Sequence, residues 1–277
     1  MFGKAVRTQI RFMTGRIGFF LVVSVLMALA LLNYTMNVLD FQGYDVITMF
    51  HPMKMLSLSY SMSVYAGDIA TLLFQIVPLL VCLTGALSLA EEQKSGEFVL
   101  MAARLGTKRY LWSKVVAVFV VTTVAFSLPF LLEIVLNCVA FPLGATGDVF
   151  QDHAYDPARI SMEANYQLSW LYRFSPYLYA VVGTVLFGCF AGVLAAATLV
   201  LSALVRLRFR VLLLLPAFLF LQLTISWGEN GAGAWYNYIM LFHGVDRGVP
   251  YVPVIMAGLV IFTVVGTAVA ARKDALT

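Results

Sequence analysis

Charged residues are scarce in this chain. Only 12% of its 277 residues are Asp, Glu, Lys or Arg, whereas 61% are apolar, and the mean hydropathy is +0.90. Soluble domains are about one quarter charged, so this composition excludes an ordinary water-soluble fold. One protein core cannot bury so much apolar surface, and lipid is the solvent that accepts the rest. The sequence therefore predicts an integral membrane protein.

Cysteine is nearly absent, and the short motifs of common enzymes are missing. The three cysteines, Cys82, Cys138 and Cys189, all fall in apolar stretches, so the polar loops hold no disulfide framework. The sequence contains no Gly-x4-Gly-Lys-Ser/Thr, no Gly-x-Ser-x-Gly and no His-Glu-x-x-His. These absences exclude a P-loop ATPase and remove the usual signals of serine hydrolases and zinc proteases. We therefore expect no catalytic residue and no cofactor on this chain.

The histidines do not form a metal-binding pattern. His51, His153 and His243 lie in three different loops and share no helical spacing. The methionines that flank His51 are soft donors of the kind that copper(I) favours. A chain with 12 methionines produces such a cluster readily, so we expect no metal site.

Six apolar stretches have about the length that a membrane crossing requires. A hydrocarbon core of about 30 Å needs roughly 20 residues per helix. The predicted spans are residues 17–39, 69–90, 115–141, 177–205, 211–227 and 249–271. Before the sixth span, the aromatic and apolar run 235–242 is too short to cross and is predicted to be a re-entrant or interfacial segment on the outer side. We thus expect an all-α protein with a six-span transmembrane domain over residues 17–277.

The basic residues gather on one side of this predicted topology. Fourteen of the 18 fall in the segments 1–16, 91–114, 206–210 and 272–273, while the intervening loops are acidic. Because cytoplasmic segments carry an excess of Lys and Arg, these segments and both termini are predicted to be cytoplasmic. The predicted location is the cell membrane, plasma or inner, with lipids as contacts. This asymmetry indicates membrane orientation rather than a nucleic-acid surface.

Residues 1–16 are expected to form an amphipathic helix on the membrane surface. Apolar residues at helical spacing make one face (Phe2, Val6, Ile10, Met13), and basic residues make the other (Lys4, Arg7, Arg11). A disordered basic tail that serves only topology is one alternative. A signal peptide cleaved near Ala30 is another, which the continuation of the apolar run through Leu32 disfavours.

The segment 91–114 contains helix-capping residues and an apolar stripe, which a passive connector between two spans would not need. We expect Ser95 to cap a helix, Glu97 to lie in its first turn and Gly106 to end it. Between them an apolar stripe follows the i, i+3, i+4, i+7 spacing of one helix face: Phe98, Met101, Ala102 and Leu105. Such a helix, joined to two spans, is suited to receive a push from a cytosolic partner. A helix that simply lies on the lipid surface is the alternative.

Two features within the predicted spans stand out. Glu133 is the one ionisable residue inside a span, about 27 Å along the third, and Asn137 follows one turn later. We expect Glu133 either to face a translocation cavity or an interspan partner, or to be a solvated carboxylate near the outer surface. In the fourth span, Gly188 and Gly192 form a small-residue face of the kind that permits close helix packing.

This layout resembles the membrane subunits of ABC-2-type transporters, which are six-span permeases that act as dimers. In sequence the resemblance is concentrated in Glu91-Glu92-Gln93-Lys94-Ser95-Gly96-Glu97, then Arg104, then Lys108-Arg109-Tyr110 through Lys114. The family pattern is a Glu, a Gly that opens the coupling helix, basic residues, and a Lys that leads into the third span. Many members carry a proline after the coupling helix, and this sequence has none there.

The resemblance implies a function and a set of residues. A separate ABC ATP-binding subunit would bind ATP and Mg, and a second permease copy or paralogue would complete the transporter. The residues implied in ATPase coupling are Glu92, Gly96, Glu97, Phe98, Met101, Ala102, Arg104, Leu105 and Lys114. Those expected along a translocation path are Gln75, Thr84, Glu133, Gln222 and Thr224. The expected cargo is amphipathic or hydrophobic, such as a peptide, drug or lipid, moved outward.

Two other classes of function remain open at the level of sequence. A membrane scaffold or sensor would use the segment 91–114 to dock a cytosolic regulatory protein instead of an ATPase. An intramembrane enzyme is the third class, and the missing catalytic motifs make it the least favoured.

Overall fold

The computed structural model describes residues 2–43, 51–58, 66–143, 168–205 and 251–272. Within these ranges every regular element is helical, which confirms the all-α prediction. Three helices are long and apolar enough to cross a membrane: α2 (Ile17–Asp40), α6 (Thr107–Ala140) and α9 (Pro176–Leu204). They correspond to the first, third and fourth predicted spans, and they support a membrane-embedded protein.

The other predicted spans are described in part or not at all. Shorter apolar helical stretches cover Ile76–Ala86, within the second predicted span, and Met256–Ala270, within the sixth. The second of these belongs to α12 (Tyr251–Ala270). Both the fifth predicted span, 211–227, and the re-entrant segment, 235–242, lie outside the described residues. The full set of six crossings therefore stays a prediction.

The second predicted span is not one continuous α-helix. It comprises α3 (Ala66–Val81), a π-helical turn, η2 (Cys82–Ala86), and α4 (Ser88–Ser95). The helical backbone is interrupted at Gly85, where φ is 178° and ψ is −12°. Because Gly85 has no side chain, the side chain of Met13 packs directly against it. The apolar pattern marked the buried stretch, but it did not reveal this interruption.

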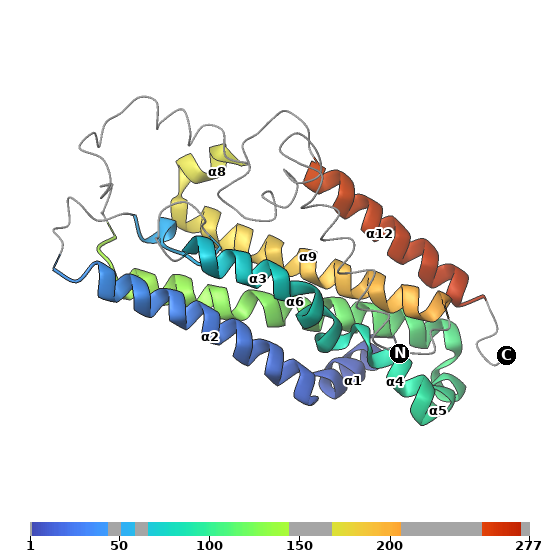
Figure 1. The fold of residues 1–277 in the computed structure, drawn as a ribbon. Helices are drawn as coiled ribbons and strands as arrows, with labels where there is room; N and C mark the ends of the chain where they lie inside the picture. The colour runs from blue at the N-terminus through green and yellow to red at the C-terminus, as the bar shows by residue number, and fades with distance from the viewer. Residues whose placement is uncertain (1, 44–50, 59–65, 144–167, 206–250, 273–277) are drawn as a thin grey trace.

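The long helices lie side by side and give the bundle two distinct ends (Figure 1). At one end are α1 (Phe2–Thr14), α4 and α5 (Glu97–Leu105), where α12 also terminates. We call this the α5 end. At the other, the α8 end, lie η1 (Pro52–Lys54) and α8 (Ser169–Phe174). Each end carries one buried polar cluster, described below.

The helices α6 and α9 pack closely in the centre of the bundle. A Cβ atom at Gly188 would lie 2.7 Å from the backbone oxygen of Thr123, and one at Gly192 would lie 2.8 Å from that of Phe119. Real Cβ contacts are not this short, so both positions require glycine. The small-residue face of the fourth predicted span is thus an interface within the chain, between α9 and α6.

Adding one methyl group at this interface tests the packing. We expect Gly188→Ala and Gly192→Ala each to destabilise the protein by roughly 1–3 kcal/mol, because backbone atoms must move apart. Gly258→Ala in α12 is the matched control, since its Cβ would meet nothing within 4 Å. Thermal unfolding of the detergent-purified protein measures all three. Equal stability of the α9 variants and the control would contradict the close packing.

Candidate functional site

The segment that follows α3 and η2 forms a bent pair of helices at the α5 end. Helix α4 ends at Ser95, Gly96 reverses the chain, and α5 covers Glu97–Leu105 before Gly106 leads into α6. Both glycines have a φ of 79°, a backbone conformation that residues with a Cβ rarely adopt. Ser95 was expected to cap α5. Gly96 takes that position instead, and the Ser95 hydroxyl donates to the backbone oxygen of Glu92 at 3.3 Å.

The predicted apolar stripe of α5 faces the protein itself. Phe98 is 4% exposed and Ala102 9%, while Met101 and Leu105 are half-buried. The ring of Phe98 meets the ring of Tyr110 edge to face, with centroids 5.3 Å apart. This stripe therefore attaches α5 to the start of α6.

The opposite face of α5 is also apolar, and it is open. Val99 is 51% exposed and Leu100 67%, and the side chains of Glu97 and Arg104 beside them are exposed as well. These two apolar residues fall outside the i, i+3, i+4, i+7 stripe, so the periodicity did not single them out. A different sequence feature could have identified them: the predicted helix is apolar on both of its faces, although it lies in a charged segment.

A buried ion pair lies where α4 meets α6. The Nζ of Lys114 donates to Oε1 of Glu92, and the Tyr110 hydroxyl donates to Oε2 of the same carboxylate. Glu92 is 3% exposed, whereas Lys114 and Tyr110 are fully buried. Lys114 also donates to Oε1 of Gln9, in α1, at 3.3 Å. Both oxygens of this buried carboxylate thus have partners.

Arg16 extends this arrangement toward the surface. Its Nη2 lies 3.3 Å from Oε1 of Glu92, and its Nη1 lies 2.8 Å from Oε2 of the more exposed Glu91. The guanidinium also lies over the ring of Phe12, 4.7 Å from its centroid. We call the set Gln9, Arg16, Glu91, Glu92, Tyr110 and Lys114 the inner ion cluster.

The inner ion cluster joins α1, α4, α6 and the residue before α2. A buried ion pair contributes little net stability, but removing one partner costs about 3–5 kcal/mol because the other charge is left unpaired in a poorly polar environment. The cluster therefore fixes geometry more than it adds stability. Of its members, sequence reasoning had selected Glu92 and Lys114 as coupling residues. It named Glu91 and Tyr110 only as part of the motif, and it missed Gln9 and Arg16, because their pairing joins segments far apart in the chain.

Helix α1 packs differently from its predicted apolar face. Its buried residues are Ala5, Gln9 and Met13, which follow one another at intervals of four. Phe2 remains 45% exposed. The helix thus lies against α6 through one face, and part of its predicted apolar stripe stays available to other contacts. The interfacial position of α1 stays a prediction.

Glu133 belongs to a second buried cluster, at the α8 end. Its Oε1 accepts hydrogen bonds from Nδ2 of Asn33 at 2.7 Å, and from the hydroxyl and backbone N–H of Ser57 at 2.7 and 2.8 Å. Nδ2 of Asn33 and Nδ2 of Asn37 each donate to the backbone oxygen of Met55 at 2.8 Å. Glu133 is only 1% exposed, so in this structure it is buried rather than solvated. Its Oε1 accepts all three hydrogen bonds, and its Oε2 has no hydrogen-bond partner in the described residues.

This arrangement holds the segment 51–58 against α2 and α6, and we call it the outer clamp. It comprises Asn33, Asn37, Met55, Ser57 and Glu133. The methionines near His51 contribute to packing here, since Met53 and Met55 are fully buried and Met53 packs in one cluster with Ile134. In the described residues no group of three or more His, Cys, Asp or Glu side chains is placed to hold a metal ion.

Of the five predicted path residues, only Thr84 and Glu133 have described side chains, and these two lie apart. Thr84 is buried and donates to the backbone oxygen of Val81, while its hydroxyl also lies 2.9 Å from that of Thr122 in α6. Thr122 and Glu133 are eleven residues apart along α6, about 16 Å. The side chains of the other three predicted path residues lie outside the described part of the structure: Gln75, Gln222 and Thr224.

Comparison with known proteins gives no family assignment. No protein-family model, curated protein or solved structure matches the chain. A functional interpretation therefore depends on the residues and contacts described above.

The outer clamp predicts unequal effects for two substitutions of one residue. Glu133→Leu removes three hydrogen bonds, two of them to the buried Asn33 and Ser57 side chains, and is expected to cost about 3 kcal/mol. Glu133→Gln is the control, because its amide oxygen can still accept these bonds; it should cost less than about half as much. Thermal unfolding in detergent measures both. A Leu variant as stable as the unmodified protein would show that the clamp does not hold the segment.

Proposed function

We propose that this chain is the membrane-spanning permease subunit of an ATP-binding cassette exporter of the ABC-2 type. The observation that carries the proposal is the construction of α5. One face of this helix is fixed to α6 by Phe98 and, through α4, by the Glu92–Lys114 pair. The other face presents Val99 and Leu100 to a partner. A helix bound on one side and apolar on the other is suited to transmit force.

The distribution of basic residues supports the orientation of this proposal. Exposed cationic side chains gather at the α5 end on α1, α5 and the first turn of α6: Lys4, Arg7, Arg11, Arg104, Lys108 and Arg109. Under the rule that cytoplasmic segments are rich in Lys and Arg, the α5 end faces the cytosol. The protein is then a multi-pass component of the cell membrane with both termini cytoplasmic.

The directions of the helices support six crossings. Helices α9 and α12 run the same way along the bundle (Figure 1). Gly266 of α12 packs against Val200, near the end of α9, in agreement with this direction. A further crossing between these two helices is part of the proposal, and the predicted span 211–227 is the segment that would form it.

The contacts at the α5 end define how force would travel. A separate ATP-binding subunit, which carries ATP and Mg, would contact Val99 and Leu100. Movement of α5 would pull on α6 through the Phe98–Tyr110 contact and on α1 through Lys114 and Gln9. Because close packing makes the interior stiff, α5 and the start of α6 would move together. A second permease copy or paralogue would complete a path for an amphipathic or hydrophobic cargo.

Charge placed on the open face of α5 tests the proposal. Leu100→Asp should reduce co-purification of a co-expressed ATP-binding subunit by at least about tenfold, because a desolvated apolar anchor becomes charged. Gly3→Asp is the control: it adds the same charge to α1, and a side chain there meets nothing within 4 Å. The Gly3→Asp variant should still co-purify with the ATPase, and after reconstitution it should still stimulate ATP hydrolysis.

Two results would contradict the proposal. One is that the unmodified chain never associates with a nucleotide hydrolase. The other is that Leu100 mediates binding of a cytosolic protein that hydrolyses no nucleotide, which would establish the scaffold function instead.

A further inference from the structure

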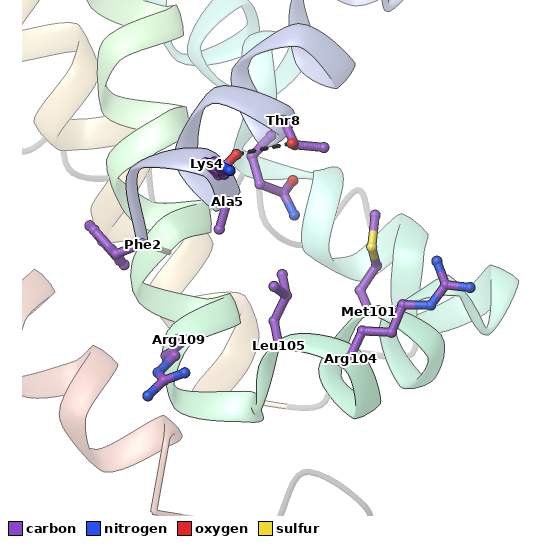
Figure 2. A pocket seen from close by; sticks show the side chains of 9 residues that line it. Phe2, Lys4, Ala5, Thr8, Met101, Arg104, Leu105 and Arg109 are labelled. Atoms are coloured by element: carbon purple, nitrogen blue, oxygen red, sulfur yellow. Dashed lines mark hydrogen bonds between the residues drawn. The ribbon is translucent and has the colours of Figure 1, made fainter.

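A cavity of about 370 Å³ lies between α1, α5 and the start of α6 (Figure 2). In Figure 2, α1 passes above the cavity and α5 lies below it, with Leu105 and Met101 directed upward between them. The residues that line the cavity come from these three helices: Phe2, Lys4, Ala5, Thr8, Gln9, Met101, Arg104, Leu105 and Arg109.

The lining combines positive charge with apolar surface. Lys4, Arg104 and Arg109 are exposed, and none of them forms an ion pair within the described part of the chain. Arg16 nearby differs, because Glu91 and Glu92 neutralise it. Cations without a carboxylate partner, next to apolar walls, favour an anionic group attached to an apolar body. Guanidinium groups match the geometry of phosphate oxygens especially well.

The position of the cavity indicates where such a ligand comes from. Helix α1 is followed within two residues by α2, whose first apolar side chains are exposed: Ile17 is 84% exposed and Phe20 59%. These side chains suit lipid, so α2 would enter the hydrocarbon region here, and α1 with its cavity would lie just outside that region, at the depth of the headgroups. The cytoplasmic leaflet is rich in anionic phospholipids, which basic residues near the membrane surface attract.

We propose that this cavity binds the phosphate headgroup of an anionic phospholipid. Lys4, Arg104 and Arg109, which line the cavity from three helices, supply the positive charge that attracts the phosphate, and the exposed apolar side chain of Phe2 contacts the start of the acyl chains. The volume suits a headgroup and leaves the chains in the bilayer, since sites that enclose whole ligands are mostly larger. The bound lipid joins α1 to α5 across a gap that the inner ion cluster does not close. This inference rests on the membrane location and on the cytoplasmic orientation of the α5 end given under the proposed function, and it does not need the ATPase partner.

Native mass spectrometry of the full-length protein tests the proposal. The protein is released from nanodiscs that contain phosphatidylglycerol and phosphatidylcholine with identical acyl chains, and the retained lipids are counted. We expect one phosphatidylglycerol to be retained preferentially. The double variant Lys4→Gln/Arg109→Gln should lower this preference about tenfold. Its matched control is Arg7→Gln/Arg11→Gln, which removes two exposed charges from α1 outside the cavity and should keep the preference.

A second variant separates the cavity from its charges. Thr8 lines the cavity, and its hydroxyl bonds only to the backbone oxygen of Lys4 in the same helix. Thr8→Phe fills the cavity and leaves every charge in place, so it should also abolish the preferential retention. Thermal unfolding of each variant confirms that it is folded.

Three results would overturn the proposal. Equal loss in the two double variants would show that diffuse surface charge attracts the lipid. Unchanged retention in Thr8→Phe would place the lipid elsewhere. Retention of glycerol 3-phosphate at millimolar concentration, with no preference for phosphatidylglycerol over phosphatidylcholine, would identify a site for a soluble organic phosphate rather than for a membrane lipid.

Discussion

The rest of the α5 end depends on the ion pair between Glu92 and Lys114. Both side chains are removed from solvent, so each needs the other, and the pair holds only while α4 and α6 keep their relative position. Tyr110 and Gln9 complete the hydrogen bonding, which extends the constraint to α1. As a result, the exposed face of α5 is presented from a fixed base rather than from a mobile loop.

Helix α6 connects the two buried clusters of the protein. Lys114 belongs to the inner ion cluster and Glu133 to the outer clamp, and they are nineteen residues apart, about 28 Å along the helix. This separation is close to the thickness of the hydrocarbon core of a bilayer, about 30 Å. In the proposed membrane orientation, Lys114 and Glu133 would lie near the two membrane surfaces, where burial of charge costs less than at the midplane. Between them α6 packs on α9 through glycine contacts.

The sequence predicted elements better than it predicted contacts. The apolar lengths located α2, α6 and α9, and the spacing of Phe98 and Ala102 located α5, because periodicity records which face of a helix avoids water. Periodicity does not record what covers that face. In this structure Phe98 is buried and its ring contacts that of Tyr110, in α6. Ser95 was expected to cap α5 because serine is a common cap, but the reversal of the chain requires positive φ, which only Gly96 supplies without strain.

The pairing of side chains was the part of the candidate site that was hardest to predict from the sequence. Nothing in the local pattern around Arg16 or Tyr110 indicates that both contact Glu92, because these pairs form only after three helices have packed. Glu133 was noticed because a carboxylate inside an apolar stretch is costly. Its partners Asn33 and Ser57 lie in α2 and in the turn after η1, and only the fold brings them to it.

A double-mutant cycle on the Glu92–Lys114 pair tests the account most directly. The free energy of unfolding is measured for Glu92→Gln, Lys114→Met and the double variant, with Glu91→Gln as a control at the partly exposed end of the cluster. If the pair fixes α4 on α6, each single variant is strongly destabilised, and the double variant recovers at least about 2 kcal/mol relative to the sum. Two results would contradict the account: additive changes in the free energy of unfolding, or single variants at Glu92 and Lys114 that are as stable as Glu91→Gln. Either result would show that the two residues do not interact and that α5 has no fixed base.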